Sequence, residues 1–215
     1  MKEKTAHLVP INYALHLEPD LECFRFYGTV EVLLSAPDTV GEIAMNILDI
    51  AIWRCQVRID DEYRDCPFLV DPRNETVQFA FPEALVGDIS IRIEFEGNIN
   101  DKMAGFYRSL YHVDGKEKYI AVTQFEESDA RRAFPCMDHP ERKATFDLEM
   151  IIDEDLVAIS NTDVAEEAPL GNGMKRVTFH QTPKMSTYLL FFGVGEFDFE
   201  VDEVDPRVRA VTLPG

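Results

Sequence analysis

Gln124 and Glu126 form a pair of polar side chains that could bind a cationic group. They lie two residues apart at the end of a strand-like run, residues 119–125. Side chains two apart in a strand share a face, so both should point the same way, with Thr123 and Phe125 opposite. A carboxylate binds an ammonium group through a charge-assisted hydrogen bond, and an amide can serve nearby backbone groups. The pair suits the free amino end of a peptide; the simpler alternative is an exposed polar pair on a strand end.

The pair opens a charged connection, residues 123–146, that also carries hydrophobic residues. Phe134, Pro135 and Phe146 are predicted to anchor it in the core. A long polar connection that is fixed at both ends is a common place for binding residues. Its alternating charges predict an ion-pair network that holds the connection in place, with substrate contact as the alternative; these charges are Glu127, Asp129, Arg131 and Arg132.

The strands that must position these residues follow from period-2 patterning. In residues 88–96, for example, isoleucine and phenylalanine alternate with polar residues, which is typical of a half-buried strand. Turn signals, among them Pro37 and Pro82, separate the runs. Helical periodicity is confined to short turns at residues 83–85 and 129–134. Gly171-Asn172-Gly173 predicts a tight hairpin turn. We therefore predict an all-β fold, an antiparallel sandwich or related stack of sheets. The predicted strands are 13–18, 26–34, 50–59, 75–81, 88–96, 119–125, 144–153, 157–161, 175–181, 186–194 and 208–212.

The cysteines do not suggest a metal site. Cys23, Cys55, Cys66 and Cys136 are irregularly spaced and form no C-x-x-C pair, so a structural zinc site is disfavoured. Reduced thiols in a cytoplasmic protein are the simplest interpretation, with a Cys55–Cys66 disulfide as the alternative. Cys136 could act as a nucleophile only with a nearby base, for which His139 is the closest candidate in sequence.

Composition narrows the classes of partner. The net charge is −19, from 21 Lys and Arg against 40 Asp and Glu. A nucleic-acid surface needs clustered basic residues, so we expect no nucleic-acid partner. No run approaches the roughly 20 apolar residues of a membrane span, and the first residues carry no signal peptide pattern, so we expect no membrane partner.

Residues 124–146 closely resemble the signature of the N-terminal β-domain of zinc aminopeptidases in the aminopeptidase N family. Five further segments agree with that family, in order: 10–21, 105–111, 159–161, 182–190 and 194–197. The resemblance implies a saddle-like all-β domain over residues 1–215 that caps a catalytic cleft. It places Gln124 and Glu126 among the residues that bind the amino terminus of a peptide substrate, and Cys136 in a structural position.

The chain departs from the family pattern in its chemistry. The family binds zinc through a His-Glu-x-x-His helix and removes N-terminal residues from peptides. None of the five histidines here shows that spacing. The expectation is a single N-terminal domain, with the zinc cofactor on a C-terminal catalytic domain absent from this chain, and no peptide hydrolysis by the chain alone. Two alternatives remain: a non-catalytic scaffold or interaction module of the same family, and a peptide- or sugar-binding sandwich with a ligand-sized cleft.

Overall fold

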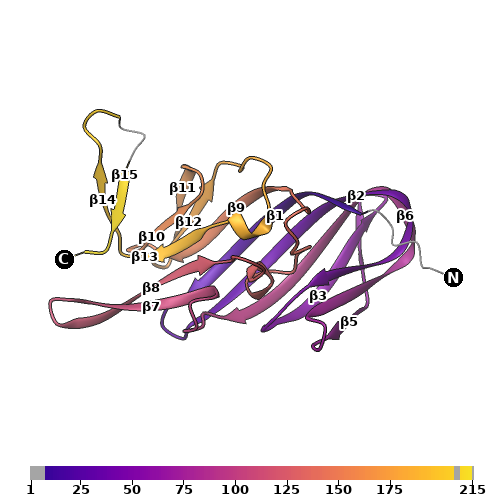
Figure 1. Ribbon diagram of the computed structural model, residues 1–215, viewed down its shortest axis with the longest axis horizontal. Coiled ribbons are helices and arrows are strands. Elements are labelled where there is room, and N and C mark those ends of the chain that lie inside the picture. The colour runs from indigo at the N-terminus through magenta and orange to yellow at the C-terminus, as the bar shows by residue number, and fades with distance from the viewer. Residues whose placement is uncertain (1–7, 206–208, 215) are drawn as a thin grey trace.

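The computed structural model describes residues 8–205 and 209–214 and is built almost entirely of β-strands (Figure 1). Its largest sheet has nine strands in the order β11-β12-β9-β1-β2-β6-β3-β4, with β5 also paired to β6. These strands are β1 (Val9–Asp20), β2 (Arg25–Asn46), β3 (Ile50–Ile59), β4 (Glu62–Asp65), β5 (Phe68–Asp71), β6 (Thr76–Asn98), β9 (Thr145–Asp153), β11 (Val164–Gly171) and β12 (Met174–Phe179).

A four-stranded sheet in the order β10-β13-β8-β7 packs on the large one, and a two-stranded hairpin, β14-β15, stands to one side (Figure 1). Their strands are β7 (Gly105–Val113), β8 (Lys116–Gln124), β10 (Val157–Ser160), β13 (Phe192–Gly195), β14 (Asp198–Val201) and β15 (Arg209–Thr212). Two short 3-10 helices complete the fold, η1 (Ala130–Arg132) and η2 (Thr187–Leu189). The predicted all-β stack of sheets is confirmed, although β1 and β9 pair in parallel.

The prolines at 37 and 82 do not end strands, so two sequence predictions at these positions are wrong. β2 and β6 each continue through them, and no helical turn forms at residues 83–85. The reason is that both prolines fall where the β2–β6 ladder shifts register, between its Ala36–Gly87 and Glu42–Ala80 pairs. A proline is tolerated at such an irregularity because its missing N–H is not needed for the ladder.

The predicted strand at residues 186–194 is only partly correct. Its first half forms η2, and the strand β13 starts at Phe192. Side-chain hydrogen bonds account for the difference: the Ser186 hydroxyl donates to the Pro140 carbonyl at 2.6 Å, and the Thr187 hydroxyl donates to the Asp138 carboxylate at 2.7 Å. Such bonds offer the backbone an alternative to a sheet ladder.

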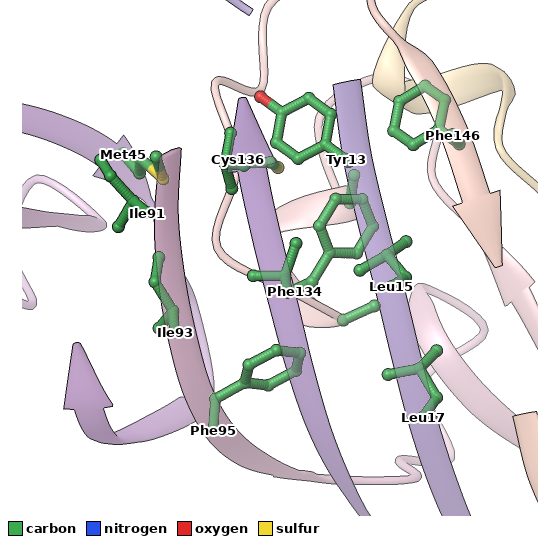
Figure 2. Packing of buried hydrophobic residues seen from close by; sticks show 14 of the residues in the cluster. Tyr13, Leu15, Leu17, Met45, Ile91, Ile93, Phe95, Phe134, Cys136 and Phe146 are labelled. Carbon is green, nitrogen blue, oxygen red and sulfur yellow. The ribbon is translucent and has the colours of Figure 1, made fainter. Parts of the chain in front are cut away.

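The core lies between the two larger sheets. Tyr13, Leu15 and Leu17 of β1 are at most 2% exposed, and Figure 2 shows them on the same side of the strand. Tyr13 stacks on Phe146 of β9 with ring centroids 5.3 Å apart, and it contacts Phe134 edge-on at 6.0 Å. The residues predicted to anchor the charged connection, Phe134, Pro135 and Phe146, are all buried.

A row of phenylalanines joins the two sheets. Phe26 of β2 contacts Phe106 of β7 at 5.3 Å between ring centroids, and Phe106 contacts Phe192 of β13 at 5.1 Å. Phe192 in turn contacts Phe125, directly after β8, at 5.9 Å. Edge-on aromatic pairs of this kind add about 0.5–1.5 kcal/mol each to the effect of burial. The end of β8 is therefore held against the core on its inner side.

Replacing Gly173 by alanine is expected to cost about 1–2 kcal/mol of unfolding free energy, because an L-residue other than glycine is strained in the left-handed region. Gly173 has a φ of +78° and, with Asn172 at +53°, forms the predicted turn between β11 and β12. A Cβ there would meet nothing within 4 Å, so any loss of stability would come from backbone strain and not from a steric clash.

Gly41 supplies the matched control for this experiment. It lies in β2, has no positive φ, and an added Cβ would also meet nothing within 4 Å. Gly41→Ala should leave stability unchanged or raise it by up to about 1 kcal/mol in urea unfolding. Equal stability of Gly173→Ala and the wild type would contradict the turn geometry.

Candidate functional site

Gln124 and Glu126 lie at the end of β8, where the four-stranded sheet meets the charged connection. Gln124 is the last residue of β8 and pairs with Gly105 of β7. Both side chains are exposed, whereas Thr123 and Phe125 are only 6% and 1% exposed. The alternation that the spacing predicts is therefore present, with the amide and the carboxylate on the outer side.

The inner residues fix the backbone of this segment. The Thr123 hydroxyl accepts a hydrogen bond from the Phe192 N–H at 3.0 Å and lies 3.3 Å from the Phe192 carbonyl oxygen. The Phe125 ring contacts Phe192 and Phe134, with centroids 5.9 Å and 6.1 Å away. Anchoring on both sides of Gln124 reduces the conformational entropy that ligand binding would otherwise cost at this position.

The outer side chains have no partner among the described residues. Across residues 8–205 and 209–214, neither the Gln124 amide nor the Glu126 carboxylate makes a side-chain hydrogen bond or ion pair. Glu127, which follows through a cis peptide bond, is likewise exposed and unpaired in this part of the chain. An exposed carboxylate without a counter-ion can accept a hydrogen bond from a ligand cation.

Most of the charges that follow form the predicted network. Arg132 pairs with Asp129 at 2.7 Å and also with Asp49, which lies between β2 and β3. Arg131 pairs with Glu75 at 2.9 Å and with Asp138 at 3.0 Å. The predicted ion-pair network is confirmed for Asp129, Arg131 and Arg132, whereas Glu127 takes no part in it.

The Arg131–Asp138 pair is largely buried. The Asp138 side chain is 1% exposed and that of Arg131 14% exposed. Asp138 also accepts a hydrogen bond from the Thr187 hydroxyl at 2.7 Å, and its own N–H donates to the Asn46 side chain at 3.1 Å. These contacts tie the connection to β2 and η2, and so they hold the backbone that carries Glu126.

Sequence reasoning missed several supporting residues, because each is remote in the chain. Asp49, Glu75 and Thr187 reach the network from other elements, and no local pattern identifies them as partners. Gly105 has φ +69° and faces Gln124 across the β7–β8 ladder. A Cβ on Gly105 would lie 2.6 Å from the Cβ of Arg132, so this glycine allows η1 to pack against β7.

Cys136 has a structural environment. It is fully buried, and its backbone exchanges hydrogen bonds with Asn46 at 2.7 and 3.2 Å. Burial, together with the negative charge of Asp138, raises the pKa of the Cys136 thiol well above its usual value. A neutral thiol is a weak nucleophile, and His139, the candidate base, is exposed on the surface.

The described residues do not fit the zinc ion that the resemblance implies. Among the described residues, no group of three or more His, Cys, Asp or Glu side chains is arranged to hold a metal. Nor does this part of the chain contain a helix long and apolar enough to cross a membrane.

An open hollow of about 650 Å³ lies on the polar face of the nine-stranded sheet, and neither Gln124 nor Glu126 lines it. Most of its polar side chains already have partners, either in the hollow or beside it. His16 contacts Glu149 at 2.7 Å and Glu18 at 3.0 Å, and Glu31 accepts a hydrogen bond from Ser90 at 2.6 Å. Groups already satisfied in this way offer little to a ligand, so the hollow does not favour the peptide- or sugar-binding sandwich.

Known proteins with similar sequences indicate the family of this chain. Residues 9–189 match the family model described as the Peptidase M1 N-terminal domain. Aminopeptidase 2 of Candida albicans is 39% identical over 210 residues, which cover 96% of this chain and 22% of that protein. Aminopeptidase M1 of Arabidopsis thaliana is 38% identical over 208 residues, covering 94% of this chain and 23% of that protein. The alanine/arginine aminopeptidase of Saccharomyces cerevisiae is 36% identical over 220 residues, covering 97% and 25%.

This chain thus spans about a quarter or less of the length of these relatives. The match extends over the candidate pair, the ion-pair network and both larger sheets up to residue 189. The chain belongs to the family of M1 peptidase N-terminal domains.

Proposed function

We propose that this chain is the substrate-binding cap of a zinc-dependent aminopeptidase, and that Gln124 and Glu126 bind the amino terminus of the peptide. The observation that carries the proposal is the state of the pair: two exposed polar side chains with no partner in the described part of the chain, on a backbone fixed from the inner side. A peptide α-ammonium would donate to the Glu126 carboxylate, and the Gln124 amide would hydrogen-bond nearby peptide backbone.

The proposal divides the work between this chain and a C-terminal catalytic domain. Such a domain would hold the zinc and the general base, because the described residues here do not fit a metal site. This chain would cap the catalytic cleft and contribute binding and orientation. Orientation of this kind lowers the entropic part of a barrier without any chemistry by the cap itself. A cytoplasmic location is part of the proposal and rests on the four free thiols.

In the whole protein, Glu126→Ala is expected to lower kcat/KM for unblocked peptides by about 10- to 150-fold. That range corresponds to about 1.5–3 kcal/mol for a hydrogen bond to a charged group. Because the ammonium is bound in both the ground state and the transition state, most of the loss should appear in KM. Steady-state kinetics with one peptide series measure both constants.

Glu127→Ala is the matched control, since Glu127 is an adjacent, exposed carboxylate with no ion pair to any residue that the structure describes. It should change kcat/KM by less than about threefold, as expected for a surface substitution. Equal effects of the two substitutions, or none from either, would contradict the assignment of Glu126. A whole protein that hydrolyses no peptide would instead support the alternative role, a non-catalytic scaffold.

A further inference from the structure

Two cysteines lie opposite each other at the outer edge of the nine-stranded sheet. The β3–β4 ladder pairs Gln56 with Asp65, so the next pair outward is Cys55 and Cys66. The Cys66 N–H donates to the Cys55 carbonyl oxygen at 2.8 Å, which continues the ladder to this pair. Directly opposed residues of this type have Cα atoms about 5.5 Å apart. A disulfide requires about 4.4–6.8 Å between Cα atoms, so the backbone already has the necessary spacing.

The two thiols also interact with each other. The proximity of the two sulfurs raises the pKa of the Cys55 thiol and lowers that of the Cys66 thiol. The Cys66 thiol in turn lies 3.0 Å from the Ala80 carbonyl oxygen, to which it donates while protonated. The Ala80 contact favours the protonated form of Cys66, whereas the Cys55 thiol favours its ionised form. The lowered pKa of Cys66 makes it the first of the two to react, with Cys55 following it.

A small oxidant can reach the pair. Both residues have little exposed surface, 2% for Cys55 and 3% for Cys66. However, both line an open hollow of about 480 Å³ at the surface, together with Trp53, which is 55% exposed. Cys136, in contrast, is fully buried and none of the four hollows described has it in its lining.

We propose that Cys55 and Cys66 form a redox-sensitive dithiol that closes to a disulfide in the presence of hydrogen peroxide. The Cys66 thiolate attacks one peroxide oxygen, the O–O bond breaks, and after protonation a sulfenic acid and one water are formed. The Cys55 sulfur then attacks the Cys66 sulfur and forms the S–S bond. The hydroxyl leaves with the Cys55 proton as a second water. Two thiols are oxidised, and one peroxide is reduced to two waters.

Formation of the disulfide would hold β4 more firmly at the edge of the sheet. In the described part of the chain, β4 pairs only with β3, so its other side is an unpaired edge. A cross-link at its C-terminal end limits the separation of β4 from β3 and closes a short loop. The expected consequence is slower backbone amide exchange in residues 62–65 of the oxidised chain, by about tenfold or more, while exchange in β1 stays unchanged.

The test uses the 215-residue chain with Cys23, the exposed cysteine, replaced by serine. After treatment with hydrogen peroxide, the chain is unfolded, its remaining thiols are alkylated, and it is digested with trypsin without reduction. Arginines separate the thiols into peptides 55–58, 65–73 and 133–142. The expected product is 55–58 linked to 65–73, with a loss of two thiols per chain and with Cys136 fully alkylated.

Recovery of 55–58 and 65–73 as separate alkylated peptides, under conditions that fully oxidise Cys23 in the wild type, would overturn the proposal. The same holds if the linked peptide forms only when peroxide is added to the chain in denaturant. Cys55→Ser provides the second measurement, because Cys66 should then stop at the sulfenic acid, which dimedone labels. An absence of label on Cys66 in a variant with wild-type circular dichroism would also overturn it.

Discussion

Replacing Phe125 by alanine is expected to lower the unfolding free energy by about 3–5 kcal/mol, the range for truncating a buried aromatic side chain. Phe125 is 1% exposed and lies where the two sheets meet. Its ring contacts Phe192 of the four-stranded sheet and Phe134 of the charged connection, which in turn contacts Tyr13 of the large sheet. The cavity would therefore remove contacts with the four-stranded sheet and with the connection that links it to the large one.

Leu69→Ala provides the control, because Leu69 is 71% exposed on β5. It should change stability by no more than about 0.5 kcal/mol in the same urea titration. A Phe125→Ala chain within about 1 kcal/mol of the wild type would show that the sheets do not depend on this ring.

The Phe125 substitution also has a consequence for the site. Phe125 separates Gln124 from Glu126 in the sequence, and its burial directs both neighbours outward. Under conditions where the whole protein stays folded, Phe125→Ala should weaken binding of peptides, because a less fixed backbone loses more entropy on binding. Phe125→Leu, which keeps an apolar side chain there, should retain more of both stability and binding.

Arg131→Met is expected to cost about 3–5 kcal/mol, the range for removing one partner of a buried ion pair. The substitution keeps an apolar stem of similar length but leaves Asp138, whose side chain is 1% exposed, without its cation. The Thr187 hydroxyl and the Arg131 backbone N–H would still donate to that carboxylate, but they do not neutralise it. Chemical denaturation measures the loss.

Two further variants test whether burial and uncompensated charge cause this loss. Arg58→Met removes an exposed pair, in which the side chains of Arg58 and Asp61 are 48% and 90% exposed, and should cost at most about 1 kcal/mol. Adding Asp138→Asn to Arg131→Met should restore part of the loss, because the uncompensated charge is then absent. Additive losses in the double variant would mean that the pair is not coupled.

The fold was predictable where its pattern is local. The alternation around Tyr13, Leu15 and Leu17 indicates a half-buried strand, and all three residues are buried. Gly171-Asn172-Gly173 indicates a hairpin turn, and the φ angles agree. Where the sequence suggested a break at Pro37 or Pro82, tertiary pairing prevailed, because β2 and β6 stay paired through two successive register shifts there.

The candidate site was predictable only in part. The spacing of Gln124 and Glu126 and the aromatic residues around them indicate an outward-facing pair on an anchored segment. The residues that hold this segment in place pair across long stretches of the chain, for example Arg131 with Glu75, 56 residues apart. The parallel pairing of β1 with β9 joins residues 133 apart, such as His16 and Glu149. Contacts of this range leave no periodic signal, so a single sequence cannot reveal them.

The central claim is that Glu126 recognises the α-ammonium group of a peptide. The most direct test compares two competitive inhibitors of the whole protein, a short peptide with a free α-amine and the same peptide with that amine replaced by hydrogen. The ratio of their inhibition constants should favour the amine in the wild type, and Glu126→Gln should reduce that ratio by about tenfold or more. A ratio that is the same in Glu126→Gln and in the wild type would contradict the claim.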